Sequence, residues 1–137
     1  MKEALKEARK AMADDEVPVG AVVVCNNLVI ARAYNMTERL NDVTAHAEMQ
    51  AITAAANYLG SKYLNDCTLY VTLEPCTMCA GASYWAQMGM IVYGAKDEKR
   101  GYTNVDPDVL HPGTIVISGI LAEECKTLLN DFFNLKR

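Results

Sequence analysis

No apolar run in the sequence is long enough to cross a membrane. The longest, Ala21 to Cys25, has five residues, whereas a membrane-spanning helix needs about 20. The first residues, Met1 to Met12, alternate Lys and Glu with Ala and Leu and contain no hydrophobic core of the kind that signal peptides have. We therefore expect a cytoplasmic protein with no membrane partner.

Internal repeats, low-complexity tracts and flexible linkers are missing as well. The 137 residues are 51% apolar and 22% charged, which is typical of a soluble globular domain and excludes a disordered or fibrous chain. A chain of this length buries roughly two thirds of its unfolded surface when it folds. We therefore expect residues 1–137 to form a single domain whose core needs no disulfide bonds.

Positive charge is in short supply. Thirteen Lys and Arg residues stand against 17 Asp and Glu residues, which gives a formal net charge of −4. Nucleic acids are bound non-specifically through extended basic surfaces, so this balance disfavours such a surface but leaves room for a local patch. The side chains that could form a patch, or only an ordinary solvated face, are Lys96, Lys99, Arg100, Lys136 and Arg137.

Hydrophobic periodicity predicts nine helices and strands in the order α-β-β-α-β-α-β-β-α. The expected helices are 2–12, 45–59, 77–88 and 122–134, and the expected strands are 19–25, 28–34, 67–72, 90–93 and 114–118. Thr44 is the expected N-cap of the second helix, and Gly60 is expected to end it. The hairpin implies an antiparallel pair and the β-α-β crossovers imply parallel neighbours. The sequence therefore predicts an α/β fold with a mixed five-stranded sheet and helices on both faces.

Two short segments carry the residues that are best suited to chemistry. Cys76 and Cys79 lie three residues apart at the start of an expected helix, so both thiols share one face. The free N–H groups and the dipole at a helix N-terminus favour thiolates. His46 lies in the first turn of another expected helix. One imidazole nitrogen and two sulfurs form a donor set that suits tetrahedral zinc.

Each of these residues has other interpretations when it is taken alone. A Cys-x-x-Cys pair also occurs in redox proteins or as two buried thiols, and a lone helical histidine is usually packed in the core or serves as a helix cap.

A closed structural zinc site needs a fourth protein ligand. The candidates for a fourth ligand are Cys25, Cys67, Cys125 and His111. Because Cys25 and Cys67 fall on expected strands and resemble small buried apolar residues, we favour a fourth position that is open to water. The five cysteines, an odd number in a chain without an export signal, do not indicate a disulfide framework.

Glu48 is the candidate proton carrier. Residues two apart do not share a helix face, so His46 and Glu48 serve one site only if the metal lies near the helix end. Zinc bound by two thiolates and a neutral imidazole is formally neutral, and it acidifies water less than an all-histidine site does. A nearby carboxylate base is then required. We expect Glu48 to be that base rather than an ordinary solvated helix residue.

The spacing of these residues resembles a known signature. His46-Ala47-Glu48 is followed, after residues 49–74, by Pro75-Cys76-Thr77-Met78-Cys79, as in the zinc-dependent nucleobase deaminases. Further segments extend the similarity to bacterial tRNA-specific adenosine deaminases over nearly the whole chain. These segments are Val17–Ala21, the loop at Asn35, Leu69–Cys76, Met78–Ala82 and Asp131–Phe133.

The resemblance implies a fold and an activity. The fold is the cytidine deaminase-like fold, a three-layer α/β/α sandwich. The activity is the zinc-dependent hydrolytic deamination of adenosine to inosine at the wobble position of a tRNA anticodon. The resemblance also implies one zinc ion per subunit and a homodimer that binds the anticodon stem-loop.

The same resemblance assigns roles residue by residue. It implies that His46, Cys76 and Cys79 hold the zinc and that Glu48 shuttles protons. The implied substrate contacts are Asn35 on the flipped nucleoside, Val17 in the base pocket, the backbone around Ala47 on the base, Asp97 near the nucleotide backbone, and Phe132 and Phe133 beside the anticodon-loop groove. For one of the two phenylalanines, packing in the core is the better expectation.

Two other functions stay open at this point. Gly81–Ala86 also resembles bacterial guanine deaminases, so the chain could deaminate a free base or nucleoside such as guanine or cytosine. The other alternative is a non-enzymatic binding module that zinc stabilises, for which four protein ligands would be the mark.

Overall fold

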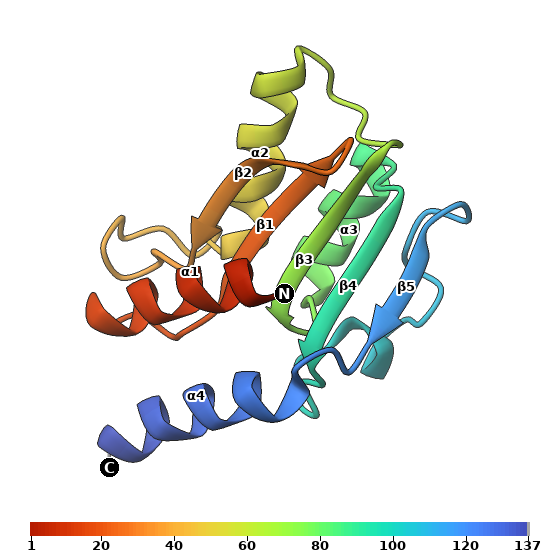
Figure 1. Cartoon of the computed structure of the whole chain (residues 1–137). Coiled ribbons are helices and arrows are strands. Elements are labelled where there is room, and N and C mark those ends of the chain that lie inside the picture. Colours follow the sequence, from red (N-terminus) through yellow and green to blue (C-terminus); the bar gives the residue numbers. More distant parts are fainter. Residues whose placement is uncertain (137) are drawn as a thin grey trace.

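The expected order of helices and strands is confirmed in the computed structural model, which describes residues 1–136. The helices are α1 (Lys2–Ala13), α2 (Ala47–Leu59), α3 (Thr77–Ala86) and α4 (Ala122–Leu135), with a short 3-10 turn η1 (Tyr102–Asn104). The strands are β1 (Gly20–Cys25), β2 (Leu28–Tyr34), β3 (Cys67–Leu73), β4 (Met90–Ala95) and β5 (Ile115–Ser118). Figure 1 shows their arrangement along the chain. Among the described residues, no helix is both long and apolar enough to span a bilayer.

The strands form one mixed sheet in the order β2-β1-β3-β4-β5. β1 is antiparallel to both β2 and β3, while β3–β4 and β4–β5 are parallel. The hairpin between β1 and β2 turns at Asn26 and Asn27, whose φ angles are 52° and 62°. Asparagine tolerates this left-handed region, which two-residue hairpin turns require. The predicted mixed five-stranded sheet is therefore confirmed.

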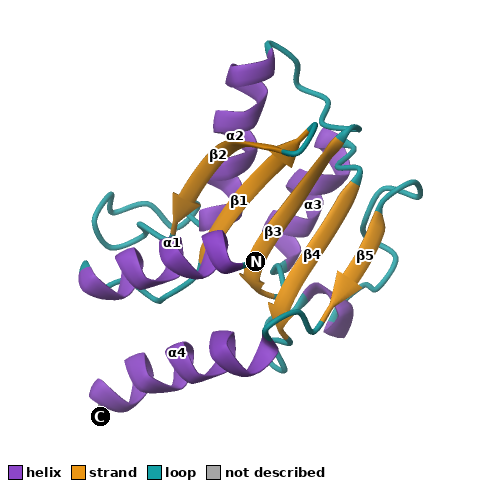
Figure 2. Cartoon of the chain, in the orientation of Figure 1, coloured by secondary structure: helices purple, strands orange, loops and turns teal. Residues whose placement is uncertain are grey.

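Helices cover both faces of the sheet. α1 and α4 lie on one face and α2 and α3 on the other (Figures 1 and 2), so the expected three-layer α/β/α sandwich is confirmed. α1 comes very close to β1, because a Cβ atom on Gly20 would lie 2.1 Å from the carbonyl oxygen of Ala4. A glycine at this position is what allows the helix and the strand to touch.

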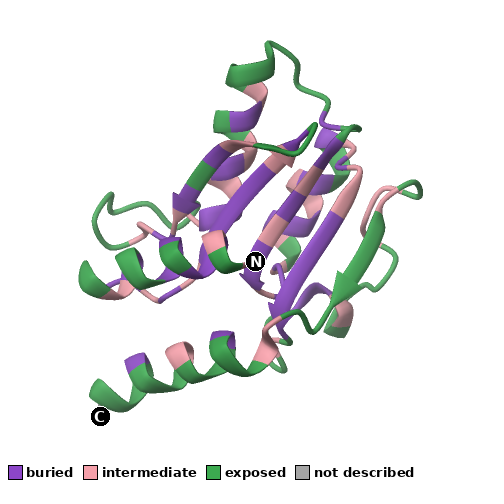
Figure 3. Ribbon diagram, viewed as in Figure 1, coloured by how far each residue is buried: buried purple, intermediate pink, exposed green. Residues whose placement is uncertain are grey.

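The apolar core lies along the central strands. Leu69 and Val71 on β3 and Ile91 on β4 are completely buried, whereas all four residues of the edge strand β5 are exposed (Figure 3). The accessible surface of 7475 Å² is close to the roughly 7,000 Å² expected for a compact chain of this length. The buried interior gives the site a rigid support.

Two helix boundaries differ from the prediction. α2 begins at Ala47 with the extended residue His46 as its N-cap, because the Thr44 hydroxyl is engaged with Asp42 at 2.7 Å in the preceding turn. α3 ends at Gln87 in the left-handed region, not at Gly89. Gly89 serves a different contact, since a Cβ there would lie 2.1 Å from the Asn65 carbonyl oxygen.

Candidate metal centre and its cavity

The three residues predicted to bind zinc lie at the amino ends of two helices. His46 is the N-cap of α2, Cys76 is the N-cap of α3, and Cys79 lies in the first turn of α3. α2 and α3 share one face of the sheet (Figure 2). The positive ends of both helices therefore face the two sulfurs, which stabilises thiolates there.

The geometry of the three side chains fits a tetrahedral zinc ion. His46 Nδ1 lies 3.6 Å from Cys76 Sγ and 3.5 Å from Cys79 Sγ. With zinc–nitrogen and zinc–sulfur bonds of about 2.0–2.1 and about 2.3 Å, the nitrogen–sulfur edge of a tetrahedron is about 3.5 Å. The three ligand atoms lie within 4.8 Å of one another, and no other His, Cys, Asp or Glu of residues 1–136 joins the group. The residues considered as a fourth ligand therefore lie elsewhere.

One of the three ligands already has the charge that zinc binding needs. Hydrogen bonds from Cys79 and from the His46 imidazole lower the pKa of Cys76 to about 4. The same contact with Cys76, together with burial, raises the pKa of Cys79, and Cys76 raises the pKa of His46. Cys76 is thus a thiolate at neutral pH, whereas Cys79 and His46 hold their protons more tightly, and zinc binding would displace these protons.

Glu48 lies in the first turn of α2, next to the metal ligands. It is 4% exposed, and burial is the main reason why its pKa is raised to about 7. A carboxyl group with a pKa near neutrality is able both to accept and to return a proton.

The metal ligands and Glu48 share one small cavity of about 250 Å³. The cavity is lined by Val17, Val19, Asn35, Thr37, His46, Ala47, Glu48, Leu73, Glu74, Cys76, Asp97 and Arg100. Its volume is below the usual range for pockets that hold drug-sized ligands. The site therefore has room for a group about the size of one nucleobase.

Comparison with known proteins identifies the family. The profile of the cytidine and deoxycytidylate deaminase zinc-binding region matches residues 1–95. The tRNA-specific adenosine deaminase of Bacillus subtilis is 46% identical over 138 residues, covering 97% of this chain and 86% of that protein. The chain belongs to the tRNA-specific adenosine deaminase family. The zinc-binding triad of this family member is His46, Cys76 and Cys79.

Solved structures are similar to this family member as well. A structure from work on A-to-I editing by tRNA:A34 deaminases at the wobble position of transfer RNA has a TM-score of 0.88 and 46% identity, covering 94% of this chain and 97% of that one. The guanine deaminase of Bacillus subtilis has a TM-score of 0.67 and 43% identity, covering 69% of this chain and 61% of that one. The cytidine deaminase-like fold is thereby confirmed.

The structure of this family member brings most of the predicted substrate residues together. Val17, Asn35, Ala47 and Asp97 all line the metal cavity. The two phenylalanines separate: Phe132 is 7% exposed, and Phe133 is 48% exposed. Phe133 lines a second groove of about 800 Å³ beside Val17 and Asp97. Phe132 does not line that groove but borders a separate one of about 730 Å³ with Val17 and Lys136, so its contact with substrate stays a prediction.

The expected basic patch is divided. Lys96 pairs with Glu74 at 3.6 Å, and Lys136 pairs with Asp15 at 2.5 Å. The groove beside Phe133 is lined by basic and acidic side chains together: Lys96, Lys99, Arg100 and, from α4, Lys126, with Asp97, Glu98 and Glu123. Arg137 lies outside the described residues. The sequence did not point to Lys126, since only the fold places α4 beside the loop that follows β4.

The sequence also missed Glu74 and Arg100 as cavity residues. Glu74 follows an apolar strand directly and precedes Pro75 and Cys76. A charged residue at the buried end of a strand is unusual, and that was the available signal. Arg100 carried no such signal within its polar loop.

Proposed function

We propose that this chain is a zinc-dependent hydrolase that converts adenosine to inosine at the wobble position of a tRNA anticodon. The observation that carries the proposal is the cavity in which a His-Cys-Cys metal site and a buried carboxyl group meet. The 46% identity with a tRNA-specific adenosine deaminase over 97% of this chain supports the substrate class. We also propose that the protein acts in the cytoplasm, in line with the bacterial relatives that it matches.

Only the target base of the tRNA enters the cavity. A space of about 250 Å³ admits a single base, so the target nucleotide must leave the anticodon stack, which costs little in a single-stranded loop. Asn35 is 7% exposed and lines the cavity, where its side-chain amide hydrogen-bonds the nucleoside. Val17 and the backbone at Ala47 complete the walls around the base.

Glu48 moves the protons of the reaction. A zinc ion held by His46, Cys76 and Cys79 supplies Lewis-acid activation of a water molecule. The Glu48 carboxylate takes one proton as water oxygen bonds to C6 of adenine, and it delivers that proton to the ring nitrogen N1. Glu48 then takes the second proton of the water oxygen and gives it to the amino group. Ammonia leaves, and a C6 carbonyl remains.

One assay tests this function. Zinc-loaded protein is incubated with an anticodon stem-loop that carries a wobble adenosine, and the nucleosides are analysed by mass spectrometry. We expect inosine from the parent, and at least about 100-fold less from the Glu48→Gln variant. A stem-loop that stays unmodified in the presence of folded, zinc-loaded protein would contradict the proposal.

Guanine deamination is the second candidate function. It is favoured by the 43% identity with the guanine deaminase of Bacillus subtilis, although that match leaves out about a third of this chain. Free guanine, adenine and cytidine in parallel reactions separate the two functions. Xanthine from guanine, without inosine from the stem-loop, would favour the second candidate.

We also propose that the protein is a homodimer. Trp85 on α3 is 77% exposed, and it lines one groove with Tyr84 and Tyr63, of which Tyr63 is 44% exposed. Trp85 also packs edge-on against Tyr84. Exposed aromatic side chains that gather on one face are typical of protein interfaces.

Sedimentation analysis of Trp85→Ala should show a weakened dimer. Leu135→Ala, whose side chain is equally exposed on α4, should behave like the parent.

A further inference from the structure

Glu74 is a buried carboxyl group to which the mechanism above gives no part. It follows directly after β3, and its side chain is 0% exposed. A carboxylate in such a position is costly unless donors surround it. Its partners therefore reveal what it does.

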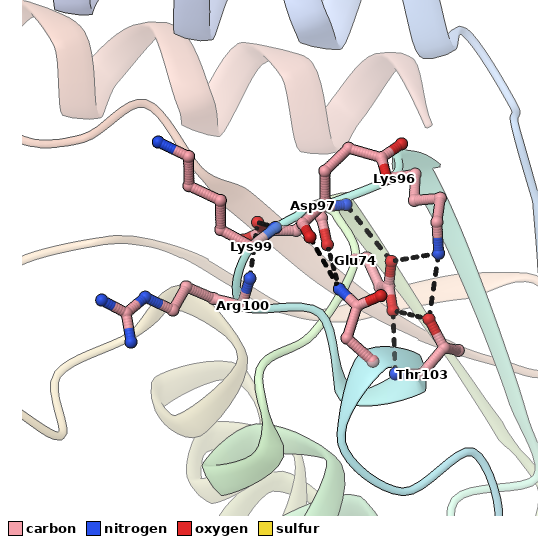
Figure 4. Close-up of polar contacts among 8 residues, drawn as sticks. Glu74, Lys96, Asp97, Lys99, Arg100 and Thr103 are labelled. Atoms are coloured by element: carbon pink, nitrogen blue, oxygen red, sulfur yellow. Dashed lines mark hydrogen bonds and ion pairs between the residues drawn. The ribbon is translucent and has the colours of Figure 1, made fainter.

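Among residues 1–136, all the hydrogen-bond and ion-pair partners of the Glu74 carboxylate come from one loop, residues 96–104. The carboxylate accepts hydrogen bonds from the backbone N–H of Asp97 at 3.2 Å and of Thr103 at 3.1 Å. It also accepts one from the Thr103 hydroxyl at 2.6 Å and pairs with the Lys96 ammonium at 3.6 Å. Figure 4 shows these contacts converging on Glu74 from both ends of the loop. One side chain thus clamps the loop at its two ends.

The clamped loop forms part of the cavity wall. Asp97 and Arg100 line the metal cavity. Inside the loop, the Asp97 carboxylate accepts hydrogen bonds from the backbone N–H groups of Lys99 and Arg100 at 3.1 and 2.9 Å. The side chains of Lys99 and Arg100 point away from Glu74 (Figure 4). The loop therefore places the Asp97 carboxylate and the Arg100 guanidinium at the cavity that the base has to enter.

The backbone of the 96–104 loop packs closely against Glu74, so the position of the loop depends on this side chain. A Cβ atom on Gly101 would lie 2.3 Å from a Glu74 carboxylate oxygen, so the loop backbone rests directly on this group. Gly101 also forms a β-bridge with Cys76, and the Tyr102 N–H donates to the Pro75 carbonyl at 2.9 Å. The loop is thereby tied both to the buried carboxylate and to the segment that carries a metal ligand.

We propose that Glu74 is a positioning residue, which clamps the 96–104 loop so that Asp97 and Arg100 meet the nucleotide at the cavity mouth. It acts on substrate affinity and leaves the zinc site and proton transfer unchanged. The proposal rests on the proposed function for the identity of the substrate only. The clamp itself can be measured without any substrate.

Glu74→Gln tests the clamp. The amide keeps the shape of the side chain but replaces one acceptor oxygen with a donor, so a loop N–H loses its partner. We expect amide hydrogen exchange at Asp97 and Thr103 to quicken at least tenfold. KM for the anticodon stem-loop should rise about five- to tenfold, while kcat stays within about twofold and the zinc content is unchanged.

Glu7→Gln is the matched control. Glu7 is 4% exposed on α1, and its carboxylate accepts a hydrogen bond from Lys10 at 2.7 Å, away from the loop. This variant also changes a buried carboxylate, and we expect it to leave loop exchange and KM as in the parent. An equal rise of KM in Glu7→Gln would overturn the proposal, because the effect would then be general destabilisation.

Thr103 gives a second test that does not alter Glu74. Thr103→Val loses the hydroxyl bond to the carboxylate, whereas Thr103→Ser keeps it, so only the valine variant should show fast exchange and a raised KM. Unchanged loop exchange in both Glu74→Gln and Thr103→Val, or loss of zinc from either, would overturn the clamp. A parent protein that does not deaminate the stem-loop would overturn the proposed function instead, and the exchange measurements would still decide the role of Glu74.

Discussion

Buried carboxylates divide into two kinds at the scale of single residues. Glu7, Glu16 and Glu74 are each at most 4% exposed, and each is matched by donors. Glu16, for example, accepts hydrogen bonds from the backbone N–H groups of Glu38 and Arg39 at 3.0 and 2.6 Å. Glu48 lines the cavity instead, and burial raises its pKa to about 7. Carboxylates that are matched by hydrogen-bond donors therefore stabilise the fold. Glu48, which has lost most of its contact with water, is suited to exchanging a proton instead.

Glu48→Gln should separate proton transfer from metal binding. The amide cannot take a proton from water, so we expect inosine formation to fall by about 10²–10⁴-fold, the usual contribution of a general base. Zinc should stay bound, because His46, Cys76 and Cys79 are intact. Single-turnover kinetics and metal analysis of the same sample check both statements. Parent-like turnover would remove Glu48 from the mechanism.

Cys76→Ala should lose zinc and stability together. Removal of one of three protein ligands weakens metal binding, and metal binding to the folded state contributes to its stability. We expect a substoichiometric zinc content and a lowered melting temperature that a chelator lowers no further. Cys25→Ala is the control, since Cys25 lies on β1 outside the ligand group, and it should retain its zinc.

At the scale of elements, neighbouring strands set the properties of a second pair of cysteines. Cys25 on β1 is directly opposite Cys67 on β3 in the antiparallel register. Burial, and next the Cys25 thiol, raise the pKa of Cys67 from its ordinary 9.0 to about 12. The folded state therefore holds this proton more tightly than the unfolded state does.

This pKa shift predicts how stability changes with alkaline pH. The contribution of the protonated Cys67 is fully present below pH 9 and is lost as the pH rises toward 12. We expect the urea midpoint of the parent to fall more between pH 8 and pH 10.5 than that of Cys67→Ala. Urea unfolding under reducing conditions measures both. Parallel pH profiles of the two proteins would show that Cys67 does not titrate as described.

At the scale of the whole molecule, a chain of negative net charge has one groove in which basic side chains slightly outnumber acidic ones. The net charge is −4, yet four cations and three carboxylates line the groove that Phe133 borders. Lys96 is paired with Glu74, which leaves Lys99, Arg100 and Lys126 for phosphate contacts. Tertiary structure brings these cations together from a loop and from α4. Long-range attraction of RNA is weak for such a protein, and binding depends on a few direct phosphate contacts.

Salt should therefore weaken binding of the stem-loop. Three contacts to single-stranded phosphates give a slope of about −2 in a plot of log affinity against log salt. We expect affinity to fall roughly 20-fold between about 50 and about 200 mM salt, as measured by fluorescence anisotropy. Lys126→Gln should lower the slope by about 0.7. A slope near zero would show that these cations do not contact phosphate.

The predicted order of helices and strands needed almost no correction, because the local hydrophobic periodicity of the sequence determines that order. Alternating and helical periodicities placed every strand and helix of Figure 1 in its order. The errors were local: Thr44 was expected to cap α2, but its hydroxyl is engaged with Asp42. A capping residue competes among several nearby partners, and the sequence does not show which one wins.

The sequence by itself determined the zinc chemistry of this protein. His46, Cys76 and Cys79 belong to residue types that are rare in this chain and lie at fixed spacings near two helix starts, so the zinc ligands could be read from the sequence. Only the tertiary structure decided what surrounds them: Phe132 inside and Phe133 outside, Lys126 beside the 96–104 loop, and Glu74 beneath it. The physical reason is that ligand spacing is a local property of the chain. Burial and long-range partners, in contrast, exist only after the helices have packed on the sheet.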